Sequence, residues 1–104
     1  MKRIVILCGI VLCFIQLNAQ EKGVQFQNLT FQEALDKAKA EDKLVFMDCY
    51  TSWCGPCKHM LNTVFVLPEM GEFFNDQFIN VKYDMEKGEG PRLRGKFRIT
   101  AYPT

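Results

Sequence analysis

The order of apolar and polar residues divides this chain into alternating helices and strands. Apolar residues recur at helical spacing over 31–38, and Thr30 with Glu33 has the spacing of a capping box at the start of that helix. A near-continuous apolar run over 44–50 predicts a central strand buried on both faces. Alternation over 78–84 predicts a second strand.

The segments between and around these strands predict further elements. A helix is expected from residue 54 to about 65, a further helical turn or two over 69–75, and a helix over 91–97 that begins at a proline. Residues 24–26 could form a short strand. Strands that alternate with helices predict a layered α/β fold with a mostly parallel core.

The amino-terminal segment has the pattern of a secretory signal peptide. A basic start at Lys2–Arg3 precedes an apolar run over 4–15, and Ala19 follows as a small residue at the expected cleavage site. The apolar run is shorter than the roughly 20 residues that span a bilayer. We therefore predict a signal peptide at 1–19, a single domain at 20–104, and an exported protein, periplasmic or extracellular, with no stable membrane anchor after cleavage.

Charge and cysteine content give no reason to expect a nucleic-acid partner or a disulfide scaffold. The formal net charge of the chain is +1, so nothing in the charge predicts a nucleic-acid partner. Removal of the signal peptide leaves 11 basic residues against 12 acidic ones and three of the five cysteines, Cys49, Cys54 and Cys57. Three thiols are too few for a disulfide scaffold, so a reactive pair and one buried thiol fit better.

The most informative motif follows the first strand and contains two cysteines with two residues between them. Its members are Trp53, Cys54, Gly55, Pro56, Cys57 and Lys58. Cys54 lies at the amino end of the expected helix, where free N–H groups and the helix dipole favour a thiolate, the form that acts as a nucleophile.

Gly55 is expected to permit a tight turn, and Pro56 suits the first helical turn. Cys57 lies one helical step inward, shielded, which fits Cys54 as the attacking thiol and Cys57 as the resolving thiol. Trp53 would shape the rim of this site, and Lys58 would lie on the next turn.

Asp48 is the only charged residue in the apolar strand that leads to the motif. A buried carboxylate needs a partner or has a raised pKa. Asp48 precedes Cys54 by six residues, so a carboxylate there could take the proton from Cys57. The alternative is that this strand tips outward and Asp48 is solvated.

Residues 46–58 resemble the active-site segment of thioredoxins, and residues 102–104 resemble the proline loop of the same family. The resemblance covers about residues 24–104. It implies a thioredoxin-like fold, in which helices pack on both faces of a central mixed sheet. The chain of this family continues past the proline loop through two antiparallel strands and a last helix. We therefore expect this sequence to be a fragment that lacks those last two strands and that helix.

The same resemblance implies the roles of individual residues. Cys54 would be the nucleophile and Cys57 the resolving thiol of a redox-active disulfide, and Asp48 would be the proton acceptor. Pro103 would be a cis proline that faces the disulfide, and the backbone of Tyr102 would pair with a bound substrate chain.

The sequence thus predicts an exported thiol–disulfide oxidoreductase that acts on protein thiols and disulfides without a cofactor. Gly-Pro between the cysteines resembles the reducing members of the family, such as thioredoxin at about −270 mV. This favours a reductase or isomerase, which would need a membrane electron donor. A zinc site is a weak alternative, because Cys49 and His59 beside the cysteine pair do not form a second paired motif. A non-catalytic thioredoxin-like interaction module, or an inactive fragment, is the other alternative.

Overall fold

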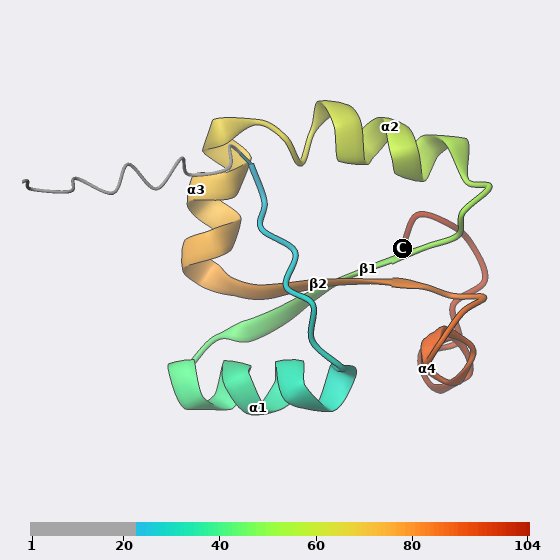
Figure 1. Ribbon diagram of the computed structural model, residues 1–104, viewed down its shortest axis with the longest axis horizontal. Coiled ribbons are helices and arrows are strands. Elements are labelled where there is room, and N and C mark those ends of the chain that lie inside the picture. Colours follow the sequence, from blue (N-terminus) through green and yellow to red (C-terminus); the bar gives the residue numbers. More distant parts are fainter. Residues whose placement is uncertain (1–22) are drawn as a thin grey trace, which may run out of the picture.

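The computed structural model describes residues 23–104, and the expected signal peptide lies outside the described residues. Figure 1 shows a sheet between two layers of helices, with α1 and α4 on one side and α2 and α3 on the other. The elements in chain order are α1 Phe31–Glu41, β1 Leu44–Tyr50, α2 Gly55–Thr63, α3 Pro68–Gln77, β2 Phe78–Asp84 and α4 Gly90–Phe97. The predicted alternation of helices and strands is confirmed.

The two strands form a parallel pair in which Leu44 lies opposite Phe78 and Tyr50 lies opposite Asp84. On its other edge, β1 pairs with the end of the proline loop. Cys49 and Thr104 exchange both backbone hydrogen bonds, at 2.7 and 3.1 Å, which is the pattern of an antiparallel pair. Parallel and antiparallel pairing therefore meet on β1, as in a mixed sheet.

Each face of the sheet has its own apolar core, because side chains alternate along a strand. Toward α1 and α4 the buried side chains are Cys49, Ile79, Val81, Phe31, Ala34, Ala38, Met85, Leu93 and Ile99. Toward α2 and α3 the Phe46 ring lies 4.8–6.5 Å, centroid to centroid, from the rings of Phe26, Phe65, Phe74 and Phe78. Residues of β1 with even numbers, which include Asp48, therefore face α2 and α3.

Two details of the strand predictions are wrong. Residues 24–26 form no strand: the Val24 N–H donates to the Phe65 carbonyl and the Gln25 N–H to the Asn75 side chain, so the two bonds go to different segments and not to one neighbouring strand. The strand over 44–50 is not uniformly buried, since Leu44 at its first position is 74% exposed.

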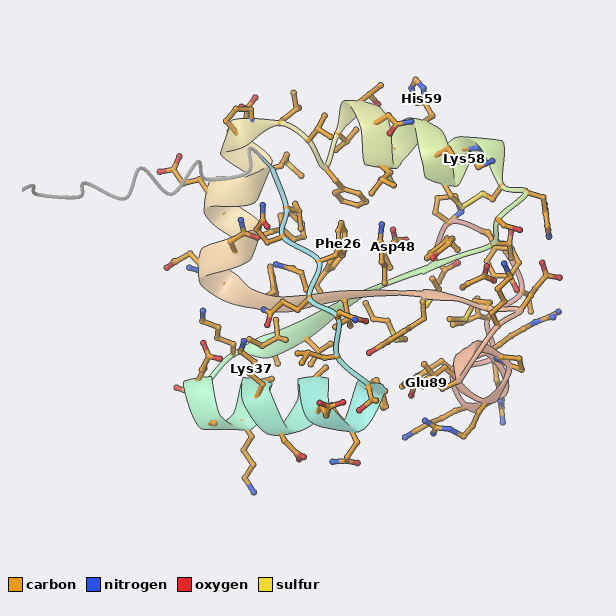
Figure 2. All side chains as sticks on the ribbon, in the orientation of Figure 1. Phe26, Lys37, Asp48, Lys58, His59 and Glu89 are labelled. Carbon is orange, nitrogen blue, oxygen red and sulfur yellow. A yellow bond between two sulfur atoms is a disulfide. The ribbon has the colours of Figure 1, made fainter. Side chains whose placement is uncertain are left out.

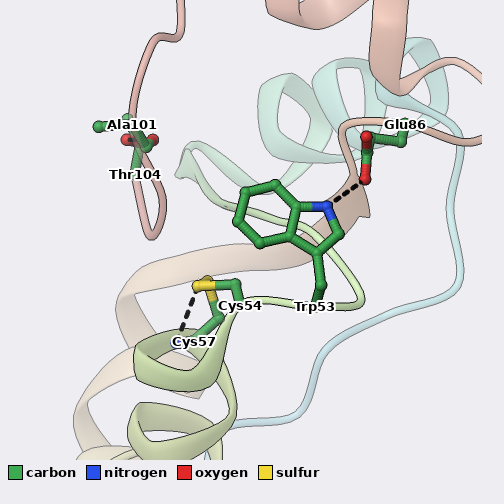
Figure 3. Close-up of a disulfide and its surroundings, with 6 residues drawn as sticks. All are labelled: Trp53, Cys54, Cys57, Glu86, Ala101 and Thr104. Atoms are coloured by element: carbon green, nitrogen blue, oxygen red, sulfur yellow. Dashed lines mark hydrogen bonds between the residues drawn. A yellow bond between two sulfur atoms is a disulfide. The ribbon is translucent and has the colours of Figure 1, made fainter.

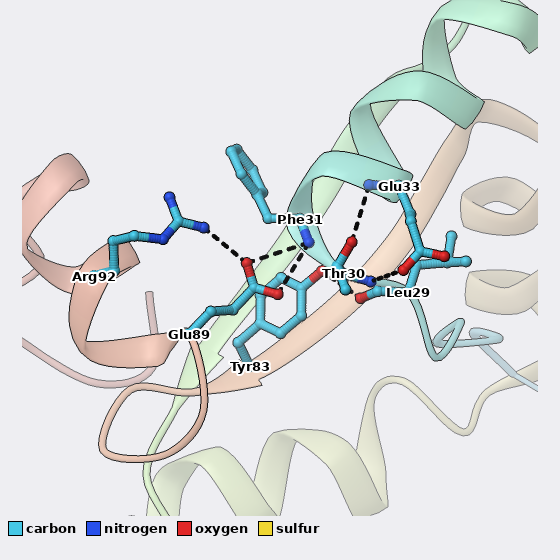
Figure 4. Close-up of polar contacts among 7 residues, drawn as sticks. All are labelled: Leu29, Thr30, Phe31, Glu33, Tyr83, Glu89 and Arg92. Atoms are coloured by element: carbon cyan, nitrogen blue, oxygen red, sulfur yellow. Dashed lines mark hydrogen bonds and ion pairs between the residues drawn. The ribbon is translucent and has the colours of Figure 1, made fainter.

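Two carboxylates hold the start of α1 (Figure 4). The Thr30 hydroxyl accepts the Glu33 N–H at 3.1 Å, and the Glu33 carboxylate accepts the Thr30 N–H at 3.2 Å, so the predicted capping box is confirmed. The Glu89 carboxylate accepts the next N–H, that of Phe31, and also pairs with Arg92 at 2.9 Å. Glu89 thereby ties α1 to α4.

Candidate active site

A disulfide between Cys54 and Cys57 lies at the start of α2 (Figure 3). Cys54 is the N-cap residue of this helix, and its Sγ accepts the N–H of Cys57 at 3.2 Å. Pro56 lies in the first turn, where the missing N–H costs nothing. A sulfur at an N-cap is close to free N–H groups and to the positive end of the helix dipole, so this position stabilises a thiolate.

Burial does not separate the roles of the two cysteines. In the disulfide form Cys57 is 6% exposed, as expected for a shielded thiol, and Cys54 is equally buried at 3%. Their backbone positions do differ, since Cys54 stands before the helix and Cys57 within it. An attacking role for Cys54 therefore rests on the N-cap position and not on exposure.

Gly55, which was expected to permit a tight turn, is the residue that directly follows the turn. Among the described glycines only Gly23 and Gly88 have positive φ, and Gly55 is the first residue of a regular helix. A Cβ at this position would meet no heavy atom within 4 Å. Gly55 therefore has open space beside its Cα, next to the disulfide.

Asp48 is buried on the same face of the sheet that α2 covers. Figure 2 shows Asp48 between the sheet and α2, and only 8% of the residue is exposed. Burial raises the pKa of this carboxyl above its ordinary value, and the positive charge of Lys82 opposes the rise in part. Lys82 is the residue opposite Asp48 in the strand register.

The third cysteine of the described chain lies on the opposite face. Cys49 is 2% exposed and packs with Phe31, Met85 and Leu93. Burial, with a smaller contribution from the negative charge of Asp48, raises the pKa of Cys49 to about 11. Since the thiolate is the reactive form, Cys49 is held unreactive.

Trp53 forms an exposed rim beside the disulfide. The residue is 67% exposed, its indole N–H donates to the Glu86 carboxylate at 2.6 Å, and its ring meets the Tyr102 ring edge-on at 6.0 Å between centroids. The Tyr102–Pro103 peptide bond is cis. Sequence reasoning missed Glu86, because it lies 33 residues from Trp53 in a loop without a recognisable motif.

The other candidate residues on α2 point outward. Lys58 and His59 are exposed, and Figure 2 shows His59 directed away from the sheet. Within residues 23–104 no three Cys, His, Asp or Glu side chains gather into a metal-binding group. None of the helices in this described part has the length and apolar character of a membrane span.

A layered α/β fold with a two-cysteine disulfide at the start of a helix, directly after a sheet strand, defines a thioredoxin-like redox protein. The chain belongs to the thioredoxin-like family: residues 14–97 match the family model described as Thioredox_DsbH, protein of unknown function, DUF255. The expected α/β thioredoxin-like fold is thereby confirmed.

Curated relatives include plant and bacterial redox proteins. The chain is 37% identical over 83 residues to thioredoxin Y1, chloroplastic, of Arabidopsis thaliana, a match that covers 80% of this chain and 45% of that protein. It is 31% identical over 74 residues to the thiol:disulfide interchange protein DsbD of Pseudomonas fluorescens, covering 70% of this chain and 13% of that protein. The chain spans about half the length of most of the curated relatives it matches.

Solved structures show the same fold. The chain is 51% identical to a "putative disulphide-isomerase" from Bacteroides thetaiotaomicron, with a TM-score of 0.70 over 81% of this chain and 69% of that one. A thioredoxin from Thermus thermophilus has a TM-score of 0.68 over 78% of this chain and 61% of that one, at 21% identity, which shows the fold alone.

Proposed function

We propose that this chain carries the active site of a thiol–disulfide oxidoreductase that exchanges disulfides with protein substrates through Cys54 and Cys57. The observation that carries the proposal is the disulfide at the N-cap of α2, where the Cys57 N–H already points at the Cys54 sulfur. The same N–H would stabilise a Cys54 thiolate once the disulfide is reduced.

The reaction proceeds in two exchanges. The Cys54 thiolate attacks one sulfur of the substrate disulfide, forms a mixed disulfide with it, and releases the other substrate sulfur as a thiolate. Cys57 then attacks the Cys54 sulfur, which restores the Cys54–Cys57 disulfide and releases the second substrate sulfur. The substrate gains two electrons, the cysteine pair loses two, and an external dithiol must reduce the pair again.

Asp48 is proposed as the base that takes the thiol proton of Cys57 before this second exchange. Support comes from its position on the α2 face and from burial, which raises the pKa of Asp48 and so makes its carboxylate a stronger base. Lys82 lies opposite Asp48, and its positive charge lowers the pKa of Asp48 in part, which favours the ionised carboxylate that can accept a proton.

Tyr102 and Pro103 are proposed as the residues that hold the substrate chain. Within residues 23–104 the Tyr102 backbone makes no hydrogen bond, so its N–H and carbonyl are available to an incoming strand. The neighbouring Thr104 pairs with Cys49 on β1, which fixes the loop beside the strand that leads to the motif.

An insulin-reduction assay with added dithiol tests the activity. The full chain should accelerate precipitation of reduced insulin, Cys54→Ser and Cys57→Ser should abolish the acceleration, and Cys49→Ser should retain it. Activity that survives the loss of Cys54 would refute the proposed site.

We also propose that the protein works in the direction of reduction or isomerisation, with a membrane protein as its electron donor. The support is the Gly-Pro pair between the cysteines, with the match to DsbD as a secondary indication. Equilibration with glutathione should give a potential near that of thioredoxin, about −270 mV, whereas a value above about −150 mV would identify an oxidant.

Export is proposed from the pattern of the first nineteen residues. When the full chain is expressed in a bacterium with a periplasm, the protein should appear in the periplasmic fraction with Gln20 as its first residue. A product that keeps its first residues and stays in the cytoplasmic fraction would contradict export.

A further inference from the structure

Helix α4 and the residue that caps it form a stretch of positive charge without acidic residues. Residues 90–98 contain no Asp or Glu, and their basic side chains, all exposed, are Arg92, Arg94, Lys96 and Arg98. Elsewhere in residues 20–104 the balance is the opposite, with seven basic residues against twelve acidic ones. The domain as a whole is therefore close to neutral, although its positive charge is concentrated at α4.

Most of this positive charge is not neutralised within the fold. In the part of the chain that the structure describes, only Arg92 among the four is paired with a carboxylate, that of Glu89 at 2.9 Å. The Nζ of Lys96 lies over aromatic rings instead, 5.2 Å from the centroid of Phe31 and 5.6 Å from that of Phe97. Three cations of α4 and its cap are therefore open to an external anion.

Apolar side chains are exposed beside these cations. Phe97 is 47% exposed, and its ring meets the Phe31 ring edge-on at 5.7 Å between centroids. Leu35 is 39% exposed and follows Phe31 by four residues, so it lies on the same face of α1. Exposed apolar side chains flanked by unpaired Lys and Arg are typical of a surface that lies at a membrane interface. The members of this basic–apolar face are Leu35, Arg94, Lys96, Phe97 and Arg98.

We propose that the basic–apolar face docks on the anionic lipid headgroups of a membrane surface. Each Lys or Arg near such a surface strengthens binding about fivefold, so the three unpaired cations together contribute about 100-fold. The Phe97 ring would enter the interface between them. Glu89, at the start of α4, does not oppose this attraction, because its charge is already paired with Arg92. Acidic residues farther than about 10 Å from the face are screened by salt.

Docking through this face leaves the disulfide accessible. The disulfide lies at the start of α2, and Figure 1 shows α2 and α3 on the side of the sheet opposite α1 and α4. A protein bound to lipid through α1 and α4 could therefore still meet its substrates. Docking would also hold the protein near the membrane electron donor proposed above, but lipid binding itself does not depend on the redox reaction.

A fluorescent reporter in the full chain tests which residue contacts the lipid. Phe97→Trp is made in a Trp53→Phe background, so that the indole at position 97 is the only one in the chain. Phe73→Trp in the same background is the matched control, because Phe73 is 57% exposed on α3, in the other layer. Vesicles that contain phosphatidylglycerol are the anionic probe, and vesicles of phosphatidylcholine are the neutral one. Binding through the amino-terminal segment alone would move neither indole into lipid.

We expect anionic vesicles at low salt to shift the emission of the Phe97→Trp reporter to shorter wavelength and to leave the Phe73→Trp reporter unchanged. About 0.3 M salt should reverse the shift. Replacing the three unpaired cations with glutamine, as Arg94→Gln, Lys96→Gln and Arg98→Gln, should raise the lipid concentration of the half-maximal shift about 100-fold. The control with the same change in net charge should stay within about threefold, and it combines Lys37→Gln, Lys43→Gln and Lys58→Gln.

Four results would overturn the proposal. They are the absence of a shift with anionic vesicles, an equal shift with neutral vesicles, an equal shift of the Phe73→Trp reporter, and equal weakening by the two sets of glutamine substitutions. The first result would favour an acidic protein as the occupant of this face. Circular dichroism checks that each variant is folded. A chain that binds lipid as expected but fails to reduce insulin would refute the proposed redox function and not this inference.

Discussion

Replacing Asp48 with asparagine should make the protein more stable and less active. Burial raises the pKa of Asp48, so the folded state favours the neutral carboxyl. Below the ordinary pKa of about 3.8 the carboxyl is protonated in both states and costs nothing. As the pH rises through that value, the unfolded chain ionises first, and the free energy of unfolding falls until the raised pKa is passed.

Asparagine has nearly the same shape as aspartate and no charge, so it should prevent this fall in the free energy of unfolding. The gain in unfolding free energy should be close to zero near pH 3 and should grow to a constant value above the raised pKa. Each tenfold change in the dissociation constant contributes about 1.4 kcal/mol. A gain of 1 kcal/mol corresponds to a rise of about 4–8 °C in Tm for a domain of this size. The same variant loses the proposed base, which contributes about 10²–10⁴-fold to such proton transfers.

Urea unfolding of the oxidised protein, followed by circular dichroism between pH 3 and pH 8, measures the first effect, and insulin reduction measures the second. Lys82→Met is the control: it should destabilise the protein at neutral pH when Asp48 is present and much less in the Asp48→Asn background. A gain that does not change with pH would refute the reasoning, because it would mean that the pKa of Asp48 is the same in the folded and the unfolded chain. Full activity of Asp48→Asn would refute its role as a base.

Three further predictions test other parts of the structure. Thr30→Ala should lower the free energy of unfolding by about 1 kcal/mol through loss of the α1 cap, while an unchanged urea midpoint would contradict the capping role. Cys49 should resist alkylation at pH 8 until the chain unfolds, since burial raises its pKa to about 11; rapid labelling of the native protein, mapped by mass spectrometry, would contradict this. Gly90→Ala should cost about 1–3 kcal/mol in urea unfolding, because a Cβ there would lie 1.8 Å from the Asp84 carbonyl oxygen; Gly95→Ala, with open space, is the control.

The parts that sequence predicts well are those that depend on neighbouring residues. Both strands have the expected limits, and the capping box at Thr30 forms as its spacing indicates. The exact place of Gly55 was not predictable, because a glycine after a turn can belong to the turn or, as here, be the first residue of a regular helix. The burial of Cys54 was not predicted, because the exposure of a side chain depends on contacts with segments distant in the sequence.

Contacts between distant segments were not accessible from local patterns. The hydrogen bond between Trp53 and Glu86 depends on the path of the loop after β2. The pairing of Thr104 with Cys49 depends on the way the proline loop returns to β1. Neither contact has a periodicity or a short-range spacing that could predict it, although both shape the surroundings of the disulfide.

The most direct test of the proposed site is the identification of the cysteine that attacks a substrate. Cys57→Ala lacks the resolving thiol, so the reduced variant, mixed with a protein disulfide, should accumulate a mixed disulfide. Peptide mapping by mass spectrometry under non-reducing conditions should find the substrate joined to Cys54, and Cys54→Ala should form no such adduct. An adduct at Cys49, or equal trapping by the two variants, would contradict the assignment of Cys54 as the nucleophile at the start of α2.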